Sequence, residues 1–115
     1  MSEIKILNEK IDKFIQERDW KQFQAPKDLA ISIVLEAAEV LEHFQFKNGD
    51  KLKKYIANHK EELGDELADT FIYLLRLAGE LDIDLIEATY KKINKNITKY
   101  PIEKFKGLAK KYNEI

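Results

Sequence analysis

Apolar residues recur along this chain three or four positions apart, the spacing of one face of an α-helix. In the first stretch the recurring residues are Ile4, Leu7, Ile11, Phe14 and Ile15. This spacing predicts a helix over residues 2–19. The same pattern predicts helices over 26–46, 58–81 and 84–100, with a short helical connector over 50–57. We therefore expect an all-α fold with a four-helix arrangement.

Start and stop signals separate these helices. Pro26 suits the first position of a helix, and Asn48-Gly49-Asp50 is a turn signal. Asn58 is followed three residues later by Glu61, the spacing of a capping box, which predicts that Asn58 caps the helix over 58–81. Asp84 is expected to cap the last long helix, which ends before a proline.

Composition narrows the class of protein further. The 115 residues include four glycines and two prolines, too few for the frequent turns of a sandwich or barrel. No linker or repeat divides the chain, so we expect one domain over residues 1–115. The absence of cysteine excludes disulfides, thiol catalysis and zinc fingers, and two histidines exclude a His-rich metal site. With a net charge of −1 and no 18-residue apolar run, we expect a cytoplasmic protein without a nucleic acid polymer or membrane as partner.

The predicted helix over 26–46 is apolar on two sides with a narrow acidic slot between them. Its expected core face carries Leu29, Ile33, Ala37, Val40, Leu41 and Phe44. Glu36 and Glu39, three positions apart, share the slot. His43 lies beside them and is interpreted as a half-buried polar residue. His59, near the start of the next long helix, is expected to be exposed.

The predicted helix over 58–81 repeats this arrangement. One line along it carries Glu62, Glu66, Asp69 and Tyr73. Its other sides are largely apolar, and Arg76 is the only charged residue in the stretch 71–78. A helix that is apolar on most sides must be buried, and a chain of 115 residues struggles to bury two such helices alone. We therefore expect a homo-oligomer.

Four carboxylates bordered by apolar faces point to a metal site, with Glu36, Glu39, Glu66 and Asp69 as the candidate ligands. Partly desolvated carboxylates that lie close together repel one another unless cations neutralise them. Oxygen ligands favour hard ions, so we expect Mg²⁺, with Mn²⁺ or Ca²⁺ as alternatives. Glu62 is a candidate for a further carboxylate outside the metal ligands. The alternative is that these acids are exposed, or paired with lysines across a subunit interface.

Charge along the chain suits a polyanion held next to such cations. Residues 61–87 contain nine acids and one base, whereas residues 91–115 contain eight lysines and two acids. Lys92, Asn96 and Tyr100 follow one face of the last long helix and offer donors to phosphate oxygens. The alternative is two solvated helix faces of opposite charge.

Aromatic residues near the acidic slot are candidates for stacking on a nucleobase. They are Trp20, Phe23, Phe46 and Tyr73. Stacking of one base on an aromatic side chain is worth about 1–3 kcal/mol. The alternative is that these residues belong to the core, which we favour for Phe23.

Several motifs together resemble the MazG-like nucleotide pyrophosphohydrolases, most closely their dCTP pyrophosphatase branch. They are Arg18–Phe23, Pro26, Glu36–Glu42, Phe44–Phe46, Glu61–Asp69, Ile72–Tyr73 and the stretch from Lys92 through Asn96 to Tyr100-Pro101. The resemblance implies an all-α MazG-like fold and a homodimer or homotetramer with sites at the subunit interface. It also implies Mg²⁺-dependent cleavage of a nucleoside triphosphate to monophosphate and pyrophosphate. The family's metal-binding carboxylates match Glu36, Glu39, Glu66 and Asp69. Relatives in this branch often carry Trp at the position of Phe46 and His at that of Ile11.

The sequence-based hypothesis is therefore a hydrolase that acts on dCTP or a modified pyrimidine dNTP. Glu36, Glu39 or Glu62 is expected to act as general base, and Lys92 to stabilise charge on the leaving pyrophosphate. A non-catalytic helical interaction protein is the alternative of another class. A ferritin-like di-iron bundle normally needs Glu-x-x-His repeats, which this chain lacks. A phosphoribosyl-ATP pyrophosphatase is a distant alternative, because the aromatic residues around Trp20 suit a pyrimidine nucleotide better.

Overall fold

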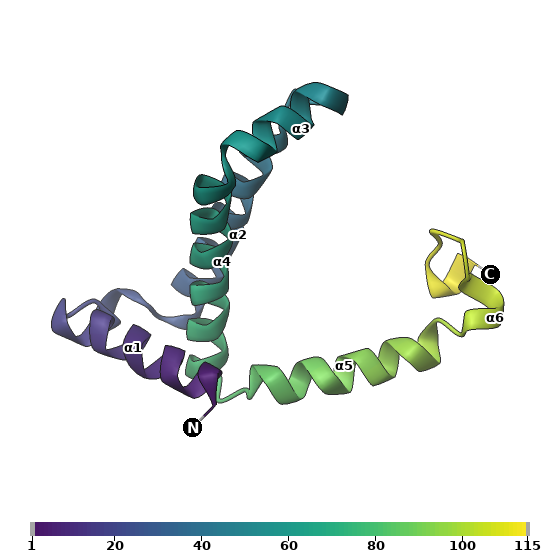
Figure 1. Cartoon of the computed structure of the whole chain (residues 1–115). Coiled ribbons are helices and arrows are strands. Elements are labelled where there is room, and N and C mark those ends of the chain that lie inside the picture. Colours follow the sequence, from purple (N-terminus) through teal and green to yellow (C-terminus); the bar gives the residue numbers. More distant parts are fainter. Residues whose placement is uncertain (1, 115) are drawn as a thin grey trace. The chain divides into compact units, whose positions relative to one another are not determined.

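The computed structural model describes residues 2–114, which contain helices and no strands (Figure 1). The helices are α1 (Glu3–Glu17), η1 (Lys21–Phe23), α2 (Pro26–Phe44), α3 (Gly49–Asn58), α4 (Lys60–Glu80), α5 (Leu85–Lys99), α6 (Ile102–Phe105) and η2 (Tyr112–Glu114). The all-α class is confirmed. The chain divides into two compact units, the first ending at Asp82 and the second beginning at Ile83. The single domain, the four-helix bundle and the homo-oligomer stay predictions.

Two of the three expected helix starts are confirmed, and one is wrong. Pro26 opens α2, and the Asp84 side chain caps α5 by accepting a 3.0 Å hydrogen bond from the Glu87 N–H. Asn58, however, is the last residue of α3, so His59 and not Asn58 is the N-cap of α4, and its side chain makes no capping hydrogen bond. Because α3 includes Asn58, this residue cannot serve as the N-cap of α4, and the predicted capping box with Glu61 does not form.

The end of α2 also differs from the expectation. The helix stops at Phe44, two residues earlier than predicted, where the Gln45 N–H still bonds to the Leu41 carbonyl. Phe46 then adopts a left-handed backbone conformation with φ of 64°. A helix cannot continue through this conformation, which explains the earlier end.

Helices α2 and α4 form the main packing pair of the first unit, and α1 and α3 both contact α4 (Figure 1). The two long helices are antiparallel, because Gln24, two residues before α2, reaches Arg76 late in α4, whereas Glu36 and Glu39 lie beside Glu66. The buried apolar residues are few among the described residues. They are Ile15, Leu29, Leu63, Leu75 and Ala78.

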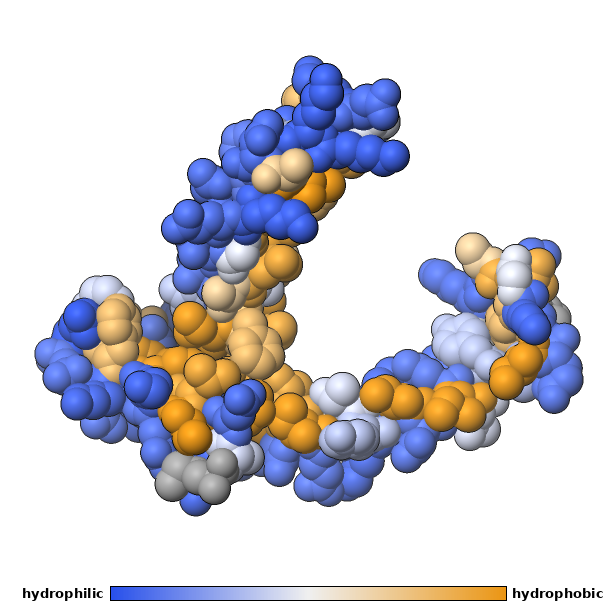
Figure 2. All heavy atoms as spheres, in the orientation of Figure 1, coloured by the Kyte–Doolittle hydropathy of each residue, from blue (hydrophilic) through white to orange (hydrophobic). Residues whose placement is uncertain are grey.

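Large apolar side chains outside this small core remain exposed. Leu41 belongs to the expected core face of α2 but is 66% exposed, and Val34, Leu35 and Leu67 are exposed as well. Figure 2 shows apolar surface in orange along the first unit. Extended apolar surface of this kind is typical of an interaction face. Within one chain the core prediction is confirmed for Leu29 and wrong for Ala37, Leu41 and Phe44, which are exposed. Only the part of the predicted face that lies next to the acidic residues is covered.

The second unit contains α5 and the short α6. On α5, Lys91 Nζ lies 2.8 Å from Glu87 Oε1, one helical turn earlier. This ion pair is solvent-exposed and contributes little to stability. At the other end, the Tyr100 and Phe105 rings meet edge to face with 5.0 Å between centroids. Among residues 2–114 no helix combines the length and the apolar character that crossing a membrane requires.

Candidate metal centre and nucleotide pocket

Three carboxylates from α2 and α4 meet at one place in the first unit. Glu36, Glu39 and Glu66 each contribute an oxygen, and these oxygens all lie within 4.8 Å of one another. Glu36 and Glu39 are three positions apart on α2, so both face α4. The antiparallel packing of the two helices then brings Glu66 beside them. We call these three residues the acidic cluster.

The acidic cluster is electrostatically unsatisfied. The Oε2 atoms of Glu36 and Glu66 are buried and have no hydrogen-bond partner among the described residues. Burial raises the pKa of Glu36 above its usual 4.5, and the charges of Glu39 and Asp69 raise it further. The pKa of Glu66 is also raised, first by a hydrogen bond with Glu39 that favours the protonated form, then by burial. The protein alone therefore disfavours full ionisation of this cluster.

The other two predicted carboxylates lie at the edge of this group. Asp69 is exposed and outside the three-residue cluster, but its charge acts on Glu36. Glu62, one turn before Glu66 on α4, is exposed. Their predicted roles, as metal ligand and as outer carboxylate, stay predictions.

The donor set of the acidic cluster fits a hard divalent cation. All ligand atoms are carboxylate oxygens, which Mg²⁺ and Mn²⁺ prefer. A cation would also provide the missing partner for the two buried oxygens and would compensate the repulsion between the carboxylates. Glu36, Glu39 and Glu66 are the residues that would hold it, with Asp69 close enough to be affected by it.

A histidine and a tyrosine adjoin the acidic cluster. His43 is half-buried, as expected, and its Nδ1 lies 2.6 Å from the Tyr55 hydroxyl on α3, while its Nε2 lies 3.8 Å from Glu66 Oε1. The expectation for His59 is wrong, because its ring stacks on Tyr55 at 3.8 Å and is half-buried. The sequence analysis missed Tyr55, and the only signal for it is a spacing of four residues from His59.

The structure brings three of the four predicted stacking residues, Trp20, Phe23 and Tyr73, to one pocket. The core assignment favoured for Phe23 is wrong, because this side chain is 65% exposed. A cavity of about 210 Å³ is lined by Trp20, Phe23, Gln24, Asp28, Leu29, Ser32 and Tyr73. Trp20 precedes α2 and is held edge to face against Phe14, with 5.6 Å between the ring centroids. Phe46 does not line this cavity and is 88% exposed.

The predicted phosphate-binding residues belong to the second unit. Lys92 and Asn96 line the same groove along α5, together with the apolar Leu85 and Ile93. Tyr100 does not line this groove and packs on Phe105. The contact of Lys92, Asn96 and Tyr100 with phosphate stays a prediction.

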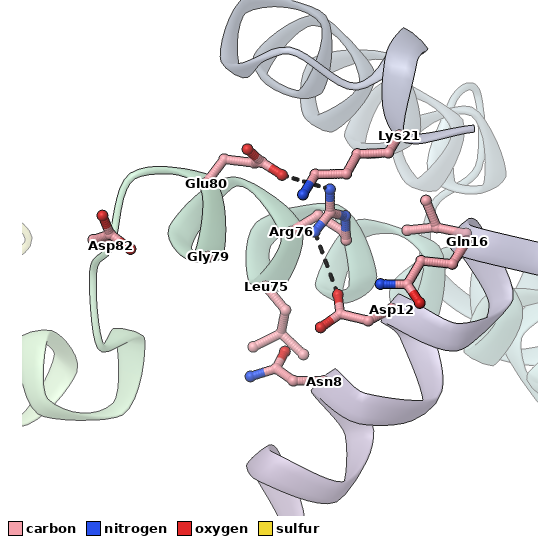
Figure 3. A pocket seen from close by; sticks show the side chains of 10 residues that line it. Asn8, Asp12, Gln16, Lys21, Leu75, Arg76, Gly79, Glu80 and Asp82 are labelled. Carbon is pink, nitrogen blue, oxygen red and sulfur yellow. Dashed lines mark hydrogen bonds and ion pairs between the residues drawn. The ribbon is translucent and has the colours of Figure 1, made fainter. Parts of the chain in front are cut away.

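A second charged group lies near the end of α4, and the sequence analysis did not identify it. Arg76 is 8% exposed and donates from Nη2 to Glu80 Oε1 at 2.9 Å (Figure 3). Its Nε donates to Gln24 Oε1 at 3.0 Å. Its Nη1 lies 3.5 Å from Asp12 Oδ1 on α1. We call these four residues the arginine cluster. Its signal in the sequence is a single charge in an apolar stretch.

This chain is similar to proteins that are named as pyrophosphatases. A model of the MazG-like family matches residues 31–115. The dCTP pyrophosphatase 1 of Mus musculus is 36% identical over 105 residues, which are 90% of this chain and 62% of that protein. The dCTP pyrophosphatase 1 of Homo sapiens is 33% identical with the same coverage. The chain thus spans about three fifths of the length of these relatives.

The fold comparison agrees with these matches. The crystal structure of a pyrophosphatase from Archaeoglobus fulgidus superposes with a TM-score of 0.82 at 36% sequence identity. The superposition covers 88% of this chain and 94% of the other. The helical arrangement described above is therefore shared along nearly the whole of a solved pyrophosphatase chain.

Proposed function

The chain belongs to the MazG-like family, and from this premise we propose that it is a nucleoside triphosphate pyrophosphohydrolase. It converts a nucleoside triphosphate to the monophosphate and pyrophosphate. The observation that carries the proposal is the acidic cluster, in which two buried carboxylate oxygens lack a partner. Its cofactor is Mg²⁺, with Mn²⁺ as the alternative.

The side chains of the acidic cluster have two roles in this proposal. Glu36, Glu39 and Glu66, with Asp69 beside them, hold the cation, which when bound neutralises the triphosphate charge and lowers the pKa of a bound water. One carboxylate accepts the proton of that water as general base, and Glu36, which has a buried oxygen without a partner among the described residues, is the first candidate. Glu39 and the exposed Glu62 are the other candidates.

The preferred substrate in this proposal is dCTP or a modified pyrimidine dNTP. Support comes from the names of the relatives and from the pocket in which Trp20 and Tyr73 provide aromatic faces. Asp28, Ser32 and Gln24 line the same pocket and offer hydrogen-bonding groups that a base can use. Phe46, exposed just beyond α2, is a further stacking residue.

We also propose that the active form is a homodimer or homotetramer. The exposed apolar residues of α2 and α4, such as Val34, Leu35 and Leu67, are the surface that a second copy would cover. Lys92, Asn96 and Tyr100 would bind the phosphates in that assembly, and Lys92 would stabilise the leaving pyrophosphate.

The test is pyrophosphate release from a panel of canonical and modified dNTPs in the presence of Mg²⁺. We expect the highest rate with dCTP or a modified pyrimidine dNTP. The variants Glu39→Gln and Asp69→Asn should lower the rate at least about 100-fold while the protein stays helical by circular dichroism. Asp65→Asn removes the same charge from an exposed position on α4 and is the matched control. Near-normal rates in Glu39→Gln and Asp69→Asn would remove the site assignment.

The exposed apolar faces favour one alternative, a non-catalytic helical interaction protein. This alternative predicts no release of pyrophosphate from any nucleotide and no change of the melting temperature (Tm) on addition of Mg²⁺. The same panel therefore decides between the two functions.

A further inference from the structure

We propose that Tyr55 on α3 and His43 on α2 act together as positioning residues that orient the Glu66 carboxylate for a divalent cation. The inference rests on the proposed function, because it gives a role in that function to two side chains outside the acidic cluster. It also gives α3 a purpose beyond connecting α2 to α4.

His43 lies between a hydroxyl and a carboxylate. Its Nδ1 is 2.6 Å from the Tyr55 hydroxyl, and its Nε2 is 3.8 Å from Glu66 Oε1. A neutral imidazole has one donor and one acceptor nitrogen. When the tyrosine O–H donates to Nδ1, the ring proton lies on Nε2 and points toward the carboxylate, the favourable arrangement for both partners.

The two oxygens of Glu66 then have different surroundings. Oε1 is the oxygen nearest to the imidazole, whereas Oε2 is buried and has no hydrogen-bond partner among the described residues. The side chains of His43 and Glu66 are only 16% and 24% exposed, so water weakens their attraction little. At 3.8 Å the contact is longer than a hydrogen bond, but an N–H on Nε2 attracts Oε1 and so favours the rotation of the carboxylate that leaves Oε2 for a cation. Partners of this kind around a metal ligand typically change metal affinity 10–100-fold.

Tyr55 is itself held from two sides, which makes its hydroxyl a fixed point. Its ring stacks on His59, with centroids 3.8 Å apart and planes 12° from parallel. The His59 Nδ1 lies 2.7 Å from the Tyr55 carbonyl oxygen, and Lys47 Nζ lies 4.2 Å from the centre of the ring. These contacts restrict the Tyr55 side chain and so keep its hydroxyl beside His43.

The test uses Mn²⁺ binding by the full chain, measured by calorimetry, together with Tm at increasing Mg²⁺ concentration. Tyr55→Phe removes one oxygen and keeps the stacking ring, so we expect about a 10-fold weaker Mn²⁺ affinity with little change of the metal-free Tm. His43→Leu should weaken binding at least as much. His43→Gln, whose amide N–H can replace the Nε2 donor, should recover most of the loss.

Two further variants separate positioning from a merely structural role. His59→Asn removes the stacking ring at a position where the His59 side chain makes no capping hydrogen bond. We expect it to lower the metal-free Tm and leave Mn²⁺ affinity unchanged. The double variant His43→Leu with Tyr55→Phe should bind Mn²⁺ no more weakly than His43→Leu alone, because both changes break one chain of contacts.

The outcomes distinguish this inference from the proposed function. If the wild-type chain binds Mn²⁺ and releases pyrophosphate while Tyr55→Phe and His43→Leu bind Mn²⁺ equally well, the positioning role is refuted and the function stands. If the wild-type chain neither binds Mn²⁺ nor hydrolyses a nucleotide, both are refuted.

Discussion

Helix α4 carries two half-buried charged groups that differ in how they are satisfied. Near its C-terminal end, the arginine cluster pairs one guanidinium with two carboxylates and a side-chain amide. Ten residues earlier, the acidic cluster places carboxylates against one another and leaves two buried oxygens without a partner. The first group stabilises the packing of α1 and α2 on α4, whereas the second opposes folding unless a cation binds. The two groups share a helix and differ in whether other side chains compensate their charge.

The physical reason is the cost of removing charge from water. A buried charge is tolerated when hydrogen bonds and an opposite charge replace the lost water. The arginine cluster meets this condition within the first unit, and the acidic cluster does not. A group that costs stability in the metal-free protein is expected where a ligand later provides the missing partner.

The largest predicted effect on stability comes from breaking the satisfied group. Arg76→Met keeps the apolar packing but leaves Asp12, Glu80 and Gln24 without their shared donor. We expect the free energy of unfolding to fall by about 3 kcal/mol in urea denaturation. Lys21→Met removes a positive charge from an exposed residue that lines one cavity with Asp12, Arg76 and Glu80, and should change stability by less than about 0.5 kcal/mol. Equal effects of the two variants would contradict a structural role for the arginine cluster.

The acidic cluster should respond in the opposite direction. Glu36→Gln removes a desolvated charge that faces Glu39 and Asp69, so we expect the Tm of the metal-free protein to rise by a few degrees. The same variant should lose the increase in Tm that Mg²⁺ produces in the wild-type chain. Thermal unfolding with EDTA and with Mg²⁺ measures both effects. A lower metal-free Tm in Glu36→Gln would show that this carboxylate is stabilising, and the contrast with Arg76 would be wrong.

The raised pKa values of Glu36 and Glu66 predict a pH dependence of the metal-free protein. Because each pKa is higher in the folded state than its usual 4.5, the folded chain binds more protons than the unfolded chain at intermediate pH. The stabilising contribution is complete below pH 4.5 and is lost as pH rises through the raised values. We therefore expect the free energy of unfolding, measured in EDTA, to fall as pH rises above 4.5. Glu36→Gln should flatten this profile, and a free energy that rises with pH there would contradict the assignment.

The helices could be predicted from the sequence because their signals are local. The spacing of Ile4 to Ile15, the proline that opens α2 and the Asp84 cap each act within one or two turns. The junction between α3 and α4 could not be placed correctly, because two helices compete for Asn58 and the packing of Tyr55 on His59 favours the longer α3. The buried face of α2 was predicted incompletely, since apolar residues surround the helix and the pattern does not say which side meets α4.

The candidate site was predictable where the chemistry follows from helix spacing. Glu36 with Glu39, and Glu66 on the facing helix, meet as the two patterns suggest. Tyr55 was not predictable, since its contact with His43 joins residues twelve positions apart through a turn whose path the sequence does not specify. The pattern along α4 indicates one partner of Arg76, because Glu80 lies four residues later on the same helix. The other two, Asp12 and Gln24, come from distant segments and are not predictable from that pattern.

The smallest predicted effect on stability concerns two residues with strained backbones, one after α2 and one after α4. Phe46 after α2 and Asp82 after α4 both have left-handed backbones, with φ of 64° and 54°. Glycine adopts this conformation without steric cost, so Phe46→Gly and Asp82→Gly should each stabilise the chain, by at most about 1 kcal/mol. The proposed function separates the two variants, because the 88% exposed Phe46 ring contributes little to the core but is available to stack on a base. We expect about a 10-fold higher KM for the preferred dNTP in Phe46→Gly, from the loss of a stacking contact, and an unchanged KM in Asp82→Gly. An unchanged KM in both variants would leave the ring at Phe46 without a role in substrate binding. The strain there would then be of the same kind as that at Asp82.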